Sequence, residues 1–423
     1  MIESNPVVPT IDPAALEQLR AELSNIQASV KRSYDTPYGA LYAPTDTVMI
    51  DRVKKLVHLL ETFDPKQFVL VGIGGSSMGA LAALSALGGA QRDFICADTI
   101  DDRYTKTLLE KFRTSLIQGH KAIVCIVTKS GSTAETIING ALFLEVLKEF
   151  YPDDYQQYVV AITDTDSALY DAAQKEGFHY LEIPRMVGGR YSVFTPVGLF
   201  PLMMMGIDID QLCQGAQQAL RSCIDESIEV NESAQCALTL YAHYKKGYAV
   251  HNLFVFSPSY VDLAQWYKQL IGESLGKQRS RLGDCGEVGF TPLVSLGTTD
   301  LHSVVQSYLA GPRTMITSFI IDTDESADLS VPANSVSNLM AGMAGRTLTS
   351  VKAAIIKGTI AAFKKEQRPS LVMHLASTSN QIGAFFVLKM VETILLAKLF
   401  DIDPFDQPAV ELYKQETRAL LKN

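Results

Sequence analysis

The sequence has no excess of basic residues, no paired cysteines and no cluster of metal ligands. Its 46 acidic and 37 basic side chains give a net charge of -9, so the surface as a whole repels nucleic acid and anionic membranes, and we expect neither as a partner. The six cysteines lack CxxC spacing and several lie in apolar runs, which favours reduced core thiols in a cytoplasmic protein. Histidines 243, 251 and 302 are not spaced as metal ligands, so we expect no catalytic metal.

Long hydrophobic runs are interrupted before they reach the length of a membrane helix. Residues 68–91 carry no charge, but Gly74-Gly75-Ser76-Ser77 divides them into a strand, a turn and a helix. Residues 370–388 contain His374 and a polar run at 377–381. With 423 residues and 47% hydrophobic content, the chain is expected to form roughly two to three domains with a well-filled interior.

Short apolar runs alternate with longer helical patterns along the chain, which is typical of a parallel sheet with helices on both faces. After helices at 13–31 and 48–62, strands are predicted at 68–71, 94–97, 122–127, 159–162 and 180–183, with helices from 78 and at 102–116, 133–150 and 167–175. Helical patterns at 195–205 and 209–244 lead into strands at 253–256, 293–295, 319–321 and 371–373, with helices at 261–275, 301–310, 348–364, 382–399 and 408–421. We therefore predict an α/β protein with an N-terminal helical segment at 1–45 and two doubly wound domains at 46–208 and 209–423, the second of which carries the C-terminal helix.

The loop Gly72-Ile73-Gly74-Gly75-Ser76-Ser77 lies between the first predicted strand of the sheet and its helix. Glycine there lets a ligand approach backbone amides at a helix N-terminus, although a simple tight turn would have the same composition. A dinucleotide site needs GxGxxG, which Ser77 breaks, and a ribose-binding acid, for which only Asp98 is available.

The loop from Thr128 to Thr133 occupies the corresponding place after the third strand. It offers four hydroxyl groups, the Lys129 ammonium and the amides of a helix that starts near Thr133, a combination that suits a phosphate. The alternative is a polar N-cap ahead of a surface helix, with Glu135 complementing the macrodipole.

Two further segments contain candidate reactive groups. Arg190 lies on a glycine-flanked loop and needs an anionic partner if it points inward, whereas a solvent-facing arginine is the alternative. Gln269 and Glu273, four residues apart on a predicted helix, share one face. The plainer interpretation is that Glu273 forms a surface ion pair with Lys277.

The last candidates are His302, Gln407 and Lys414. His302 follows an apparent helix N-cap, and the positive helix end would leave its ring neutral and able to relay a proton, although most such histidines are merely exposed. Gln407 and Lys414 are two helical turns apart, while Lys414 could equally pair with Glu411 on the surface.

Together these segments resemble the phosphoglucose isomerase family. The resemblance runs from the Gly-Ile-Gly-Gly-Ser loop at 72–76, through Gly-Gly-Arg-Tyr-Ser at 188–192, Gly-Glu-Ser-Leu-Gly-Lys at 272–277 and Thr-Asp-Leu-His-Ser at 299–303, to Phe-Asp-Gln at 405–407. It implies two sugar-isomerase (SIS) domains, each a doubly wound sheet, and a homodimer in which His302 reaches the site of the neighbouring subunit.

The resemblance also implies the reaction and a role for each matched residue. The reaction would be the reversible isomerisation of glucose 6-phosphate to fructose 6-phosphate through a cis-enediolate, in glycolysis and gluconeogenesis, with no cofactor. Glu273 would move the proton and Arg190 would stabilise the enediolate, while His302 and Lys414 would help to open the sugar ring. The implied substrate-binding residues are Gly75, Ser76, Thr128, Lys129, Ser130, Thr133, Gln269 and Gln407.

Two departures from the family pattern and two alternative functions remain. Thr128 stands where serine is common, which keeps the hydroxyl. Ala409, preceded by Pro408, replaces a glycine often seen after Phe-Asp-Gln, so the path that brings Lys414 to the sugar is expected to differ slightly. A broader isomerase that also accepts mannose 6-phosphate would share these motifs. A non-catalytic sugar-phosphate-binding regulator would keep the phosphate loops and tolerate loss of Glu273.

Overall fold

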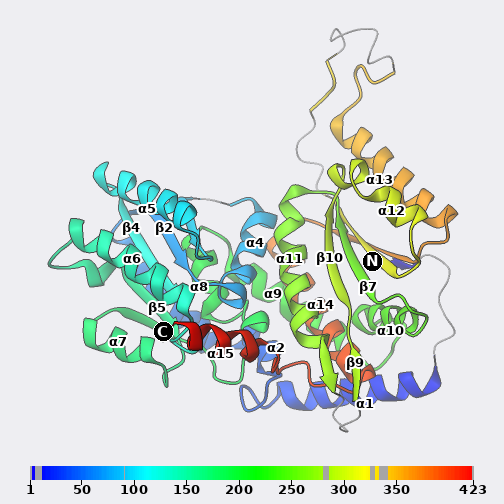
Figure 1. The fold of residues 1–423 in the computed structure, drawn as a ribbon, viewed down its shortest axis with the longest axis horizontal. Coiled ribbons are helices and arrows are strands. Elements are labelled where there is room, and N and C mark those ends of the chain that lie inside the picture. Colours follow the sequence, from blue (N-terminus) through cyan, green and yellow to red (C-terminus); the bar gives the residue numbers. More distant parts are fainter. Residues whose placement is uncertain are drawn as a thin grey trace.

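The computed structural model describes residues 2–4, 12–89, 91–279, 285–323, 329–332 and 342–421. Two five-stranded sheets dominate it (Figure 1). The first sheet has the order β3-β2-β4-β5-β6 and is parallel throughout. Its strands are β2 (Pro65–Val71), β3 (Asp93–Ala97), β4 (Lys121–Val127), β5 (Val159–Thr163) and β6 (His179–Glu182).

The second sheet repeats this plan in the order β10-β7-β11-β12-β1, with only β1 antiparallel. With β1 left aside, in both sheets the second strand along the chain lies on one side of the first, and the third lies on the other side. The strands are β1 (Ile2–Ser4), β7 (Val250–Val255), β10 (Thr291–Leu296), β11 (Met315–Asp322) and β12 (Ser370–Leu375). The predicted α/β class with two doubly wound halves is thus confirmed.

Helices cover both faces of each sheet because the strands are apolar on both faces. In the first sheet, Phe68 packs on Phe200 of α8 (Pro196–Met204), whereas Ile126, which points to the other face, packs on Gly140 of α6 (Ala134–Phe150). In the second sheet, Phe319 packs on Phe363 of α13 (Leu348–Lys365), and the opposite face joins the main core with α11 (Val261–Leu275) and α14 (Ser379–Leu399). The helices before residue 206 are α1 (Pro13–Val30), α2 (Gly39–Tyr42), α3 (Thr47–Glu61), α4 (Met78–Leu87), α5 (Asp102–Ile117), α6 (Ala134–Phe150), α7 (Ala168–Glu176) and α8 (Pro196–Met204).

The later helices are α9 (Ile209–Cys223), α10 (Glu232–Tyr244), α11 (Val261–Leu275), α12 (Val305–Ala310), α13 (Leu348–Lys365), α14 (Ser379–Leu399) and α15 (Val410–Leu420). The single helical pattern predicted for 209–244 is therefore wrong. The chain leaves the helix after Cys223, where Asn231 donates to the carbonyls of Cys223 and Asp225 and its side chain caps α10 by accepting from the Ala234 amide.

Two small β elements were also not predicted. These are the edge strand β1 and a two-stranded antiparallel sheet of β8 (Lys277–Arg279) and β9 (Cys285–Val288), directly after α11. The described residues include no helix with the length and apolar character needed to cross a bilayer. Cys125, Cys213, Cys223 and Cys236 are buried free thiols, Cys96 is half-buried, and the side chain of Cys285 lies outside the described residues.

Candidate active site

The strand order of the first sheet indicates where a ligand fits. Crossover connections leave β2 toward β3 on one side and reach β4 on the other, so a crevice opens at the carboxyl ends of β2 and β4. The loops at 72–77 and 128–133 follow these two strands. The two candidate ligand loops are therefore neighbours at the topological switch point.

The loop at 72–77 contacts the loop that carries Arg190. A methyl group at Gly75 would lie 2.7 Å from the Arg190 backbone nitrogen and closer still to the Gly189 carbonyl carbon. The Ser192 hydroxyl also donates to the Gly75 carbonyl over 3.3 Å. Only a residue without a β-carbon allows this backbone contact, so Gly75 helps to fix the position of Arg190, while Ser76 lies beside it in the short 3-10 turn η2 (Gly74–Ser76).

In the second loop, the hydroxyls of Thr128 and Thr133 lie 3.0 Å apart. Thr133 occupies the N-cap of α6, but its side chain does not cap the helix. The Lys129 ammonium donates to the carbonyls of Arg185 (2.6 Å) and Val187 (3.0 Å), and burial lowers its pKa. The loop thus brings hydroxyls, a partly desolvated ammonium and a helix N-terminus together, as a phosphate site requires.

Gly131 and Ser130 shape the tip of this loop. Gly131 has φ +65°, and a methyl group there would lie 2.7 Å from the Leu169 nitrogen, so the turn needs glycine. The exposed Ser130 hydroxyl accepts from both the amide and the hydroxyl of Ser132. Its oxygen therefore faces the open side of the loop rather than the core.

Arg190 is buried, with a side-chain exposure of 2%, and meets Glu273. Its Nη1 lies 3.3 Å from Glu273 Oε2 and 2.7 Å from Gln407 Oε1. Its other N–H groups donate to the Ser274 hydroxyl (2.7 Å) and to the carbonyls of Pro404 (2.5 Å) and Asp406 (3.0 Å). All five donors of the guanidinium are used, so the solvent-facing alternative for Arg190 is wrong.

Glu273 lies near the end of α11 with 29% of its side chain exposed. Its Oε1 accepts from Gln269 Nε2 over 3.0 Å, while its Oε2 faces Arg190. Within the described part of the chain, the side-chain Oε1 of Gln269 is buried and has no hydrogen-bond partner, and Gln269 Nε2 lies 3.1 Å from where a β-carbon on Gly74 would be. This unpaired acceptor could take a hydrogen bond from a ligand hydroxyl.

The predicted surface ion pair between Glu273 and Lys277 does not form. Lys277 is buried, and its ammonium donates to the backbone carbonyl of Glu273 (2.8 Å) rather than to its carboxylate. It pairs instead with Asp406, which arrives from a segment 129 residues further along the chain. Ser274 and Asp406 were not among the predicted site residues, although they stand inside the motifs Gly-Glu-Ser-Leu-Gly-Lys and Phe-Asp-Gln.

Among the described residues, neither His302 nor Lys414 forms a hydrogen bond or ion pair with this cluster. His302 is exposed and ends the 3-10 turn η6 (Thr299–His302) instead of starting a helix, because Asp300 accepts from the Leu296 amide and folds the turn back onto β10. Lys414 Nζ is 2.9 Å from Glu411 Oε1, the surface pair given as its alternative. Gln407, the third of these late candidates, does contact the cluster, because its side chain accepts a hydrogen bond from Arg190.

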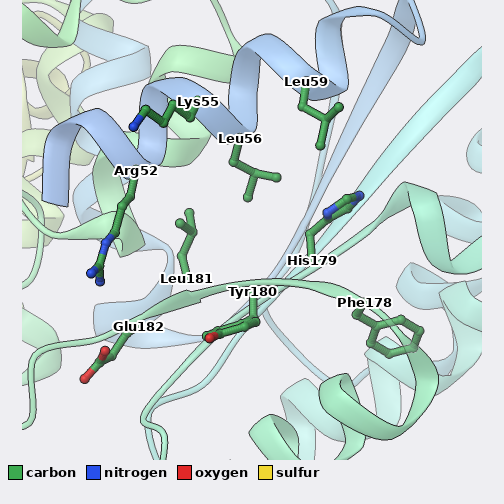
Figure 2. Close-up of a pocket in the computed structure, with 9 residues that line it drawn as sticks. All are labelled: Arg52, Lys55, Leu56, Leu59, Phe178, His179, Tyr180, Leu181 and Glu182. Atoms are coloured by element: carbon green, nitrogen blue, oxygen red, sulfur yellow. The ribbon is translucent and has the colours of Figure 1, made fainter. Parts of the chain in front are cut away.

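Two cavities among the described residues hold none of the predicted site residues, and one of them, of about 660 Å³, lies between α13 and the ends of β11 and β12. A cavity of about 610 Å³ between α3 and β6, lined among others by Leu56, Leu59, His179 and Tyr180, contains none of the predicted site residues (Figure 2). Across the described ranges, no group of three or more His, Cys, Asp or Glu side chains is arranged to hold a metal ion.

Comparisons with known proteins give consistent relatives. A family model described as phosphoglucose isomerase matches residues 61–423. A glucose-6-phosphate isomerase of Thermus thermophilus is 33% identical over 385 residues, 90% of each chain. One from Carboxydothermus hydrogenoformans is 31% identical over 370 residues, which cover 84% of this chain and 79% of the relative.

Two solved structures match the fold of the chain. The crystal structure of a hypothetical protein from Thermus thermophilus matches with a TM-score of 0.88 and 30% identity over 100% of both chains. That of a glucose-6-phosphate isomerase from Chlamydia trachomatis matches with a TM-score of 0.78 and 20% identity over 97% of this chain and 86% of the other, a likeness of fold.

Proposed function

The chain belongs to the phosphoglucose isomerase family, and we infer that it catalyses the reversible isomerisation of glucose 6-phosphate to fructose 6-phosphate, in glycolysis and gluconeogenesis. The reaction moves a proton between carbon 2 and carbon 1 of the open-chain sugar through a cis-enediolate. It therefore needs one base that can return the proton it removes, a stabiliser for the enediolate, and an anchor for the phosphate.

Glu273 is the proposed base. Hydrogen bonds from Gln269 to Oε1 and from Arg190 to Oε2 hold the carboxylate in one orientation, and its 29% exposure leaves it open to the crevice. Because the same carboxylate can deliver the proton to the neighbouring carbon, this chemistry calls for no cofactor.

Arg190 is the proposed stabiliser of the enediolate. Its guanidinium is already saturated, so an enediolate oxygen must share or replace one existing contact. The longest of these, 3.3 Å from Nη1 to Glu273, is also the one nearest to the reacting atoms. A preorganised donor of this kind supplies about 3–4 kcal/mol of transition-state stabilisation.

The phosphate would bind at the loop after β4. The proposed ligands are Thr128, Lys129, Ser130 and Thr133 with the first amides of α6, and their arrangement supports this role. Gly75, Ser76 and Gln269 would line the sugar, so that phosphate binding positions carbons 1 and 2 against Glu273.

We also propose a homodimer in which His302 acts in the site of the partner subunit. Gly272 lies against Pro292 at the start of β10, whereas His302 follows the far end of that strand, and α12 and β9 lie at opposite ends of the sheet in Figure 1. At about 3.3 Å per residue, the strand from Pro292 to Leu296 separates the two positions by about 13 Å before the turn begins. A second copy could supply His302, which with Lys414 and Gln407 would open the sugar ring.

The remaining proposals concern organisation and location. The repeated strand order supports two SIS domains at 46–208 and 209–423 after the segment 1–45. The location expected from the sequence, the cytoplasm, suits an enzyme whose phosphorylated substrate cannot cross a bilayer unaided.

The observation that carries the proposed function is the ion pair between Glu273 and Arg190, which lies next to the loop at 72–77. A spectrophotometric assay of the purified protein on glucose 6-phosphate and mannose 6-phosphate, run in parallel, tests it. Turnover of glucose 6-phosphate alone is expected, turnover of both would indicate the broader isomerase, and binding without turnover would favour the regulatory alternative.

A further inference from the structure

Lys277 makes three contacts that connect the catalytic helix to a distant segment. Its ammonium donates to the Glu273 carbonyl (2.8 Å) and the Asp406 carbonyl (2.7 Å), and lies 2.9 Å from Asp406 Oδ1. These contacts use all three of its N–H groups, and its side chain is 6% exposed. A buried ammonium this fully satisfied is held in one place.

The segment that Lys277 holds is the one that also holds Arg190. The Asp406 carbonyl accepts from both Lys277 and Arg190, and the next residue, Gln407, accepts from Arg190 through its side chain. The backbone of Glu273 and the partners of Arg190 are therefore linked through a single ammonium group.

Charge balance supports the same arrangement. Burial lowers the pKa of Lys277, and the Asp406 carboxylate opposes this effect. With Asp406 compensating Lys277, the Arg190 guanidinium is left to Glu273 and to the developing enediolate. The two ion pairs are thus linked through neighbouring groups, and one of them, Arg190–Glu273, lies at the proposed sugar site.

We propose that Lys277 and Asp406 form a clasp that positions Glu273 and Arg190 for proton transfer without touching the sugar. This inference rests on the proposed function. Lys277 and Asp406 are positioning residues, so their loss should lower the rate of the chemical step and leave phosphate binding at residues 128–133 intact.

The test compares Lys277→Met and Asp406→Asn with the wild type on glucose 6-phosphate. Because misplacement of about 1 Å costs on the order of 100-fold, we expect kcat to fall by about 10- to 100-fold in each variant. KM, and the inhibition constant of glucitol 6-phosphate, which cannot isomerise, should stay within about twofold because the phosphate loop is untouched. The double variant should be no worse than the poorer single variant, since both changes open one clasp.

A matched control is Lys268→Met, which removes an exposed lysine from the same helix and should leave all constants unchanged. Asp406 is 53% exposed, so Asp406→Asn is expected to fold even if Lys277→Met does not. A kcat for Asp406→Asn within twofold of the wild type would overturn the proposal, as would a rise in KM equal to the fall in kcat.

Hydrogen exchange of the peptide covering residues 403–409 gives a second readout that is independent of activity. Faster exchange there in Asp406→Asn, with no change elsewhere, supports the clasp, and unchanged exchange refutes it. A wild type that is inactive on glucose 6-phosphate would instead count against the proposed function, and the exchange result would still decide whether the clasp holds this segment.

Discussion

Replacement of Arg190 by lysine tests whether the fork geometry of the guanidinium, rather than its charge, carries its role. Lysine keeps the positive charge but has three N–H donors for the five acceptors that Arg190 serves, so at least two must lose their partner. An unsatisfied buried acceptor costs about 1–3 kcal/mol.

The structure indicates which acceptors are sensitive. The Gln407 side chain is exposed and can turn to water, and the Asp406 carbonyl keeps its hydrogen bond from Lys277, whereas Ser274 and Pro404 are buried. Tyr191 OH lies 3.0 Å from the Ser274 hydroxyl and 3.5 Å from the Pro404 carbonyl, so it can replace part of the loss. For two acceptors the cost is about 2–6 kcal/mol, and we therefore expect a stability loss near the lower end of that range, about 2 kcal/mol.

Catalysis should suffer more than stability. If Arg190 acts as an oxyanion donor, Arg190→Lys lowers kcat by about 100- to 1000-fold, measured in a coupled spectrophotometric assay. KM should change little because the phosphate ligands are elsewhere, and Arg185→Lys, at an exposed arginine on the same loop, is the control. A folded Arg190→Lys enzyme with kcat within threefold of the wild type would refute this reasoning.

Three further predictions concern other parts of the site. Gly75→Ala should lower kcat by about 100-fold and destabilise the fold by about 1–3 kcal/mol, because the added methyl group would displace the backbone at Gly189. Kinetics and thermal melting measure the two effects, and a variant that behaves like the wild type would contradict the contact between the two loops. Because burial lowers the pKa of Lys129, its ammonium loses its proton as pH rises through a value below 10.5. The wild-type KM should therefore rise in that pH range. A Lys129→Met enzyme whose KM shows the same rise would argue against Lys129 as a phosphate ligand. Inactive His302→Ala and Glu273→Gln proteins, mixed and reassembled, should regain about a quarter of wild-type activity if each site takes His302 from the partner, and no recovery would count against a shared site.

The sequence was sufficient for the sheets because burial leaves a strong pattern. Strands such as 122–127 and 159–162 are apolar at nearly every position, and a strand covered on both faces requires this. The loops that follow them could be located for the same reason, since the polar residues begin where the strand ends.

The break between α9 and α10 was not predicted, because it depends on hydrogen bonds from a single side chain. Residues 224–231 continue the helical pattern of α9, yet the Asn231 side chain satisfies two carbonyls at the break and caps the next helix. Such side chains compete with the helix for its own backbone groups, and hydrophobic periodicity does not report this competition.

The partners of the candidate site depended on tertiary structure. Spacing alone paired Glu273 with Lys277, but Arg190 and Asp406 reach these two groups from 83 and 129 residues away. The separation of His302 from Glu273 likewise could not be predicted, because it depends on how α11 runs along β10. Glu273 lies near the start of that strand, and His302 follows its end.

The most direct measurement is the turnover of Glu273→Gln on glucose 6-phosphate. Glutamine keeps the shape of the side chain and an oxygen that can accept from Arg190, but it cannot take up a proton. We therefore expect kcat to fall by about 100- to 10,000-fold while glucitol 6-phosphate still binds. A folded Glu273→Gln protein that isomerises the sugar at the wild-type rate would contradict the assignment of Glu273 as the proton carrier.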